Sequence, residues 1–152
     1  DPRFDKPIQD CLGGAPANVA CGLAKLGEEV AFIGGLGDDD SGMQFRKLFS
    51  SRGGDISALQ THPFLPTRIV LVRRDLSGER QFEGFVESSY KGFADQDLAL
   101  DTLKNIANKI FHNASWLVVG TIPLASETSK DALFWVVEQA KTLGLKILID
   151  IN

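Results

Sequence analysis

A run of glycines and one proline, placed directly before an amphipathic pattern, constrains this chain more than any other feature. The run reads Gly13-Gly14-Ala15-Pro16-Ala17-Asn18-Val19-Ala20. Two adjacent glycines let a ligand approach the backbone amides closely, because neither residue carries a Cβ. Pro16 presets the φ angle of a first helical turn, where the N–H that it lacks would have no helical partner. The run therefore predicts a tight turn that leads into a helix.

The apolar residues that follow continue a helix, and Gly27 stands where a left-handed residue commonly ends one. Asn18 then falls in the first helical turn, beside free N–H groups and the positive end of the helix dipole. Such neutral donors and acceptors suit the hydroxyl groups of a sugar or polyol. Gly13, Gly14 and Asn18 are the predicted sugar-binding residues. A strand-to-helix turn without a ligand is the alternative.

The rest of the chain alternates between short apolar strands and amphipathic helices. The expected strands are 29–33, 67–73, 80–86, 116–119 and 146–149, and the expected further helices are 41–50, 98–111 and 127–142. Ser41 and Ser126 are the expected N-caps, with Gly53 and Gly144 as terminators. Alternation of this kind predicts a mostly parallel sheet covered by helices. We expect strands 29–33, 116–119 and 146–149 to share that sheet.

Residues 67–86 interrupt this rhythm. The turn Asp75-Leu76-Ser77-Gly78 joins two strands whose polar and apolar residues alternate more regularly than in the others. This predicts a hairpin that forms a small separate sheet, with an extension of the main sheet as the alternative. Phe82 or Phe85 of this hairpin is a candidate to cover the apolar face of a sugar ring, and plain packing is the competing interpretation.

The glycine run resembles the N-terminal signature of the PfkB-type, ribokinase-like sugar kinases. The matching positions are Gly13, Gly14, Pro16, Asn18, Ala20, Gly27 and Gly37. The run and the segment Gly78-Glu79-Arg80-Gln81-Phe82 are most similar to the fructokinase branch. The resemblance implies a three-layer α/β/α fold with a small β lid, formed by the hairpin and a segment near Pro7–Leu12.

The same resemblance implies ATP-dependent phosphorylation of a sugar at a primary hydroxyl, with D-fructose favoured and Mg²⁺ accompanying ATP. Gly13, Gly14, Asn18, Gly120 and Phe85 would bind the sugar. In Asp150-Ile151-Asn152, Asn152 would position nucleotide phosphates and Asp150 would lie near the magnesium region. The alternative for this segment is a polar exit from a strand. A homodimer through the lid is a further expectation.

Three functional classes stay open at this point, and the first of them is the fructose kinase just described. The substrate of such a kinase could be ribose, a keto-deoxy sugar acid or a nucleoside instead of fructose. Arg68, Arg73 and Arg74 on the hairpin would favour an acid. A non-catalytic, kinase-like subunit is the third possibility.

The family's second signature, a Gly-Ala-Gly-Asp-like run that supplies the general base and the phosphate anion hole, is absent from this sequence. The family's first strand, whose Asp binds sugar, would precede Asp1. We therefore expect residues 1–152 to be the N-terminal portion of a sugar-kinase domain. The catalytic residues and most nucleotide-binding parts would lie beyond Asn152, so the chain alone would be inactive.

Composition excludes several other classes of function. The net charge of −4 argues against binding to nucleic acid or to an anionic membrane surface, and no apolar run is long enough to cross a membrane. A cytoplasmic location is expected, with the plastid stroma as the alternative. Cys11 and Cys21 lack zinc-ligand spacing, and no metal ligand is predicted in this chain. We expect no catalytic role for His62 or His112.

Two further patterns in the sequence have structural interpretations. Gly34-Gly35-Leu36-Gly37 lacks the residues that follow a phosphate loop, and Asp38–Asp40 lacks calcium-loop spacing. We interpret the Gly37–Gly42 turn mainly as loop geometry and helix capping, with a sugar contact by Asp38 as the minor alternative. Phe134 and Trp135 are expected in the core.

Overall fold

The computed structural model describes residues 11–75, 77–86 and 92–151. Its longer helices are α1 (Ala15–Lys25), α2 (Asp40–Ser51), α3 (Leu100–Phe111) and α4 (Glu127–Thr142). Two short 3-10 helices are η2 (Ala94–Gln96) and η3 (Ile122–Ala125). The strands are β1 (Gly34–Gly37), β2 (Leu59–His62), β3 (Val70–Arg74), β4 (Arg80–Phe85), β5 (Trp116–Gly120) and β6 (Lys146–Asp150).

The ends of two predicted helices follow from local chemistry. Gly14 precedes α1 at φ 111°, a left-handed conformation in which a Cβ would be strained, and Pro16 lies in the first turn. Gly27 follows α1 at φ 91°. Ser126 caps α4 by accepting a hydrogen bond from the Ser129 N–H, and Gly144 follows that helix at φ 76°. The predicted boundaries of α4 and its cap are confirmed.

The predicted cap of α2 is wrong. Asp39, not Ser41, caps this helix, because its carboxylate accepts a hydrogen bond from the Gly42 N–H at 2.8 Å. The helix therefore begins at Asp40. Gly53 has φ 82° after the helix, as a terminator should.

The first predicted strand is also displaced. Within 29–33, Ala31 makes only an isolated bridge to Asp55, and the ladder begins at Gly34. Phe32 is committed to packing instead, since its ring lies 5.4 Å from that of Phe45 and 5.8 Å from that of Phe49. The partner of β1 is β2, a parallel strand that sequence reasoning missed because only one of its four residues is strongly apolar.

The expectation of one shared sheet is wrong for the described part of the chain. β1 pairs with β2 and β5 pairs with β6, both in parallel, but no ladder joins the two pairs. The expected sharing of a sheet by residues 116–119 and 146–149 is confirmed, and only the strand near 29–33 is separate from it, because β1 exchanges its ladder hydrogen bonds with β2. Side-chain packing connects the two pairs, because Ile33 next to β1 and Leu117 of β5 pack against the same core cluster.

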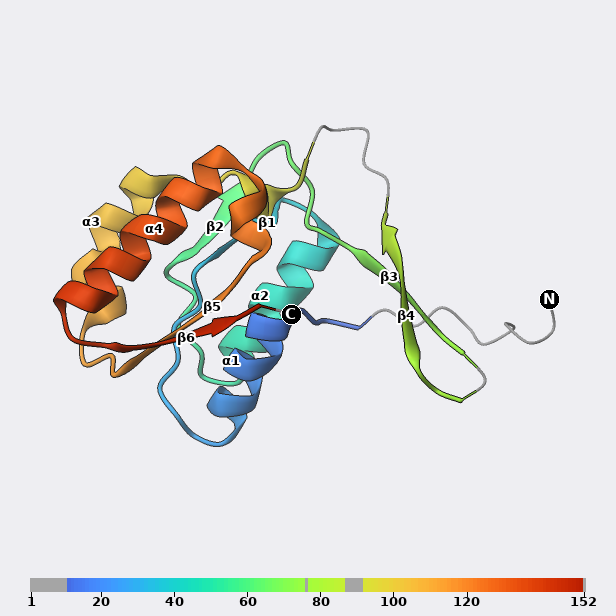
Figure 1. Cartoon of the computed structure of the whole chain (residues 1–152), viewed down its shortest axis with the longest axis horizontal. Coiled ribbons are helices and arrows are strands. Elements are labelled where there is room, and N and C mark those ends of the chain that lie inside the picture. Colours follow the sequence, from blue (N-terminus) through green and yellow to red (C-terminus); the bar gives the residue numbers. More distant parts are fainter. Residues whose placement is uncertain (1–10, 76, 87–91, 152) are drawn as a thin grey trace.

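Two clusters of buried side chains lie on opposite sides of the strands. One cluster joins α1 and α2 to β1 and β2 through Ala17, Ala20, Cys21, Leu36, Phe45, Phe49 and Leu59. The other joins α3 and α4 through Ala58, Leu98, Leu103, Ile110, Ala132 and Val136. Figure 1 shows the same layering, with α3 and α4 on one side of the strands and α1 and α2 on the other. The α/β fold class is confirmed.

The predicted core pair on α4 is half right. Trp135 packs against the second cluster, and its ring lies 6.4 Å from that of Phe111. Phe134 is 54% exposed, because the next position on a helix points about 100° away. Cys21 is buried and Cys11 is exposed.

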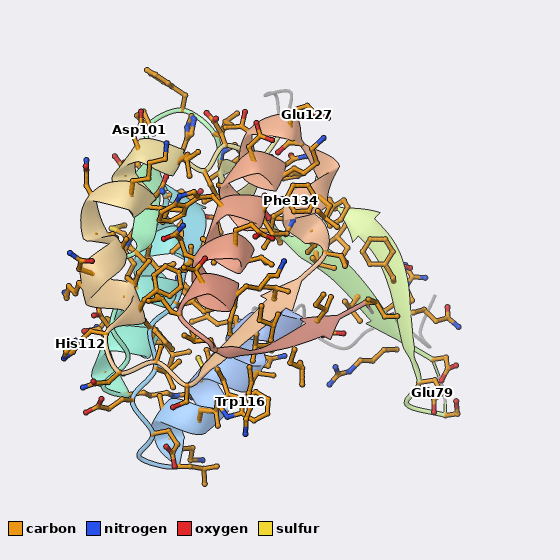
Figure 2. The ribbon with its side chains drawn as sticks, turned by 60° about the vertical axis from the view of Figure 1, so that its left-hand side comes forward. Glu79, Asp101, His112, Trp116, Glu127 and Phe134 are labelled. Carbon is orange, nitrogen blue, oxygen red and sulfur yellow. The ribbon has the colours of Figure 1, made fainter. Side chains whose placement is uncertain are left out.

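The predicted hairpin is a separate antiparallel sheet of β3 and β4 that projects from the layered body (Figure 1). Asp75 shapes its turn by accepting hydrogen bonds from the Ser77 N–H and hydroxyl and from the Glu79 N–H. Figure 2 shows Glu79 at the end of the hairpin, far from α3. Val70 stands opposite Phe85, and Val72 opposite Phe82, so one face of the hairpin is apolar.

Candidate sugar site

The N-terminus of α1 meets the carboxyl end of β5. A Cβ added to Gly120 would lie 2.8 Å from Cγ of Pro16, so the backbone of β5 approaches the first turn of the helix closely. No side chain caps this helix, and its first N–H groups gain no partner in that way. Two of the three segments that carry predicted sugar-binding residues therefore meet at one strand end.

Asn18 lies next to the glycine pair. Its Oδ1 would be 4.0 Å from a Cβ added to Gly13, and its own N–H donates to the Gly14 carbonyl at 2.8 Å. The Asn18 side chain is exposed, so its amide is accessible to a ligand at the helix start. This arrangement can present neutral hydrogen-bond donors and acceptors to hydroxyl groups.

A cleft of about 240 Å³ opens beside these residues, between α1 and α2. Its lining consists of Leu12, Gly13, Ala17, Asn18, Cys21, Phe45, Leu48 and Arg52. It thus brings Gly13 and Asn18 together in one surface. Gly14, Gly120 and Phe85 are not among the lining residues, so the cleft does not unite the whole predicted set.

Phe85 stands at the base of the hairpin and is held there by a guanidinium. The Cζ atom of Arg68 lies 4.6 Å from the centre of the Phe85 ring and 4.4 Å from that of Phe93. Phe82, the other aromatic candidate, packs against Phe85 at 5.4 Å and is 64% exposed. The structure gives Phe85 a defined place beside Arg68.

Two of the three hairpin arginines that would favour an acidic substrate already have carboxylate partners. Arg68 makes a two-pronged contact with Asp95, from Nε at 2.7 Å and Nη2 at 2.9 Å. Arg73 pairs with Glu83 on the neighbouring strand at 2.7 Å. An acidic substrate would have to compete with these carboxylates.

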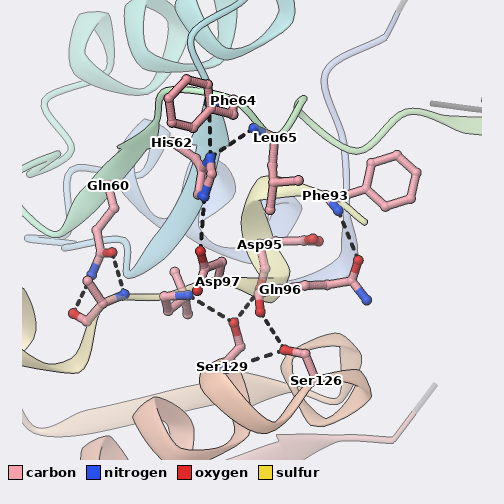
Figure 3. A network of polar contacts seen from close by, with 12 residues as sticks. Gln60, His62, Phe64, Leu65, Phe93, Asp95, Gln96, Asp97, Ser126 and Ser129 are labelled. Atoms are coloured by element: carbon pink, nitrogen blue, oxygen red, sulfur yellow. Dashed lines mark hydrogen bonds and ion pairs between the residues drawn. The ribbon is translucent and has the colours of Figure 1, made fainter. Parts of the chain in front are cut away.

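The segment that carries Asp95 is held by polar contacts from three directions (Figure 3). The buried Ser129 hydroxyl donates to the Asp95 carbonyl at 2.8 Å and accepts from the Leu98 N–H at 3.1 Å. Ser126 donates to the Gln96 carbonyl, and the Gln60 amide exchanges two hydrogen bonds with the backbone of Ala99. Sequence reasoning missed this network, because its members are scattered over 70 residues of the chain.

His62 joins the same network in one tautomer. Its Nδ1 accepts hydrogen bonds from the N–H groups of Phe64 and Leu65, so Nε2 carries the proton that is donated to Asp97 at 3.0 Å. These contacts fix the conformation of the loop before β3, so the His62 ring has a structural role there.

Asp39 ties the Gly37–Gly42 turn to the start of the hairpin. Besides capping α2, its carboxylate accepts from the Thr67 N–H and the Thr67 hydroxyl, each at 2.7 Å, while Thr67 Oγ1 accepts from the Gly37 N–H. Burial alone would raise the pKa of Asp39, but the hydrogen bonds from Thr67 and Gly42 outweigh it and lower the pKa. A carboxylate held in this way stays ionised and structural.

The Gly34–Gly37 run has a steric explanation. A Cβ on Gly35 would collide with the carbonyl oxygen of Ala94 in η2, and a Cβ on Gly37 would lie 2.6 Å from the Thr67 nitrogen. These glycines let β1 approach two other segments closely.

The predicted nucleotide contact, Asn152, lies outside the described residues, as do residues 7–10 of the predicted lid segment. Asp150 ends β6, and Gly120 is its partner on β5. Among residues 11–75, 77–86 and 92–151, no group of three His, Cys, Asp or Glu side chains is arranged to hold a metal ion. In that same part of the chain, no helix has the length and apolar content to cross a membrane.

Comparison with known proteins identifies the family. The model of the pfkB family of carbohydrate kinases matches residues 8–150. A fructokinase of Vibrio alginolyticus is 34% identical over 99% of this chain, but the chain spans only 46% of that protein.

Two solved structures share the fold. The fructokinase of Xylella fastidiosa with bound ATP superposes with a TM-score of 0.80 at 26% identity, over 100% of this chain and 47% of its own. The fructokinase of Vibrio cholerae O395, bound to fructose, ADP and a calcium ion, gives a TM-score of 0.75 at 30% identity, over 93% of this chain and 43% of its own. The chain thus spans about half the length of the proteins that it matches.

Proposed function

The chain belongs to the pfkB family of carbohydrate kinases, and on that premise we propose that the whole protein transfers a phosphoryl group from ATP to a primary hydroxyl of a sugar. D-fructose is the favoured substrate, supported by the similarity to fructokinases. The observation that carries the proposal is the meeting of Pro16 with Gly120, because ligands of open α/β sheets gather at the carboxyl ends of the strands.

In this proposal the described residues bind and orient the sugar. The backbone amides of Gly13 and Gly14 and the side chain of Asn18 contact hydroxyl groups. Gly120 leaves room beside them, and Phe85 covers an apolar face of the ring. Phosphoryl transfer gains most of its rate from positioning, so a site that only orients the acceptor is a necessary half of the machinery.

ATP supplies the phosphoryl group, and its site is proposed to lie mostly beyond Asn152, together with the general base. Proteins commonly bind Mg²⁺ through one or two carboxylates together with the phosphates of the substrate. Mg²⁺ therefore enters the proposal only as a companion of ATP, and no step is assigned to it. Because the reaction needs ATP, a cytoplasmic location belongs to the same proposal.

An uncharged sugar fits better than a keto-deoxy acid. The pairing of Arg68 with Asp95 and of Arg73 with Glu83 neutralises two of the charges that would attract an acid. A panel assay that couples ADP formation to sugar, with fructose, ribose, a keto-deoxy acid and a nucleoside, tests the choice on the whole protein. Turnover of the acid above that of fructose would contradict it.

Asn18→Ala tests the site itself. Loss of its hydrogen bonds should raise the sugar KM about tenfold and leave the KM for ATP unchanged, since a lost polar contact costs about 1–3 kcal/mol. Gln44→Ala, at an exposed position of α2, is the control. An unchanged sugar KM in Asn18→Ala would make Asn18 structural.

A homodimer through the hairpin is a further part of the proposal. Its apolar face, Val70, Val72, Phe82 and Phe85, is between 41% and 64% exposed, and a two-stranded sheet cannot cover such a face alone. Sedimentation of the whole protein with Val72→Asp should show monomer where the unchanged protein shows dimer. A monomer in both would refute this part.

A further inference from the structure

The hairpin is attached to the layered body at two consecutive residues, and the second of them is an arginine with a mostly buried side chain. Thr67 is bound by Asp39, and the next residue, Arg68, reaches Asp95 with two nitrogens. The Arg68 side chain is only 12% exposed. A planar guanidinium that is both paired and stacked has one allowed orientation, which a single-point contact would not impose.

The residues that bind Arg68 belong to the layered body and not to the hairpin. Asp95 and Phe93 contact the guanidinium, and the Ser129 hydroxyl of α4 donates a hydrogen bond to the Asp95 carbonyl. The Ala94 carbonyl packs directly against Gly35 of β1, and the Ala94 N–H donates to the Pro66 carbonyl at 2.9 Å. Arg68 therefore connects the hairpin to a segment that is itself fixed to the layered body.

Phe85 contacts the same guanidinium from the hairpin side. The Arg68 Cζ atom lies 4.6 Å from the centre of the Phe85 ring and 4.4 Å from that of Phe93, and the two ring centres are 5.8 Å apart, so the guanidinium lies against two rings that also contact each other. A rotation of the hairpin about its base would disturb these ring contacts and the ion pair together. Cation–aromatic contacts gain strength when the cation is withdrawn from water, as it is here.

We propose that Arg68 is a positioning residue: by joining Asp95 and Phe93 to Phe85, it sets the angle of the hairpin over the sugar site. This inference rests on the proposed function for its consequence in catalysis. Arg68 does not touch the sugar itself. It acts by keeping Phe85 where its ring can cover the substrate, so that none of the free energy of sugar binding is used to order the hairpin.

The first test measures the position of the hairpin directly and needs no activity. Spin labels are placed at Glu79→Cys and Asp101→Cys, which lie on the hairpin end and on α3 (Figure 2), in the whole protein with Cys11, Cys21 and every other native cysteine replaced. Electron–electron distances should form one narrow distribution. Arg68→Gln and, separately, Asp95→Asn should broaden it about twofold.

Glu83→Gln is the matched control. Glu83 also forms an ion pair on the hairpin, but with Arg73 of the adjacent strand, so its loss removes a cross-strand contact within the hairpin. Its distance distribution should equal that of the unchanged protein. Distributions that stay narrow in both Arg68→Gln and Asp95→Asn would overturn the inference.

The second test separates positioning from a purely structural role. If the hairpin spends about a tenth of its time in the competent pose, the apparent sugar affinity falls about tenfold. Arg68→Gln should therefore raise the sugar KM about tenfold without changing the KM for ATP, and Arg68→Lys, which keeps the charge but not the fork, should recover only part of it. Broadened distances with an unchanged sugar KM would refute the link to the site.

The two proposals fail in different ways. A whole protein that phosphorylates no sugar in the panel would end the proposed function, while the distance measurement would still decide whether Arg68 holds the hairpin.

Discussion

Replacing Asp39 with alanine should release both the start of α2 and the base of the hairpin. The carboxylate accepts three hydrogen bonds, from the Gly42 N–H and from the N–H and hydroxyl of Thr67. Losing an N-cap costs about 0.5–2 kcal/mol, and leaving a partly buried donor without its acceptor costs about 1–3 kcal/mol. Because water reaches part of this site, we expect a local loss of about 3 kcal/mol rather than the full sum.

Hydrogen exchange measures that local loss. In the whole protein, the amides of Gly37, Gly42 and Thr67 should exchange about 100-fold faster in Asp39→Ala, since each 1.4 kcal/mol is a factor of ten. Peptides from α4 should keep their exchange rates, because this helix packs in the other core cluster. Asp38→Ala, at an exposed neighbouring position, is the control.

A double-mutant cycle tests the reasoning behind the number. Thr67→Val removes the hydroxyl that donates to Asp39 and accepts from Gly37. If these groups act as one network, the double variant should lose about 1 kcal/mol less than the sum of the two single losses. Full additivity, or exchange in Asp39→Ala within about threefold of the unchanged protein, would refute the reasoning.

Three further outcomes are expected. The pKa of Asp39 is lower in the folded protein than in the unfolded chain. Its ionised carboxylate therefore contributes fully to the stability of the fold above the unfolded pKa of about 3.9, and this contribution is lost as the pH falls through the folded pKa. The difference in thermal stability between the unchanged protein and Asp39→Asn should shrink as the pH falls below about 4, and a constant difference would contradict this. Gly35→Ala should destabilise the fold by about 1–3 kcal/mol and so lower the melting temperature by several degrees, because its Cβ would meet the backbone of Ala94. Gly22→Ala, with open space around it, should leave the melting temperature unchanged. The isolated 152-residue chain should show no sugar-dependent ATP turnover above a heat-treated sample, and measurable turnover would mean that a catalytic base lies within it.

Local sequence rules located most helices and the hairpin because their signals are short in range. The helix of Glu127–Thr142 carries its own cap and its own terminator, and Gly14 and Pro16 mark the start of α1 within three residues. The wrong N-cap of α2 shows where local rules fail. Asp39 and Ser41 are both good N-cap residues two positions apart, and only the contact with Thr67, 28 residues away, decides between them.

The sequence by itself determined the α/β class, the family, and the candidate residues Gly13, Gly14 and Asn18, because a spaced motif reports one turn and one helix start. Only the tertiary structure decided that β1 pairs with β2, that Gly120 meets Pro16, and that Arg68 binds Asp95 beside the rings of Phe85 and Phe93. Each of these contacts joins segments that lie far apart in the chain. Their geometry depends on how helices and strands pack, which no local pattern of residues encodes.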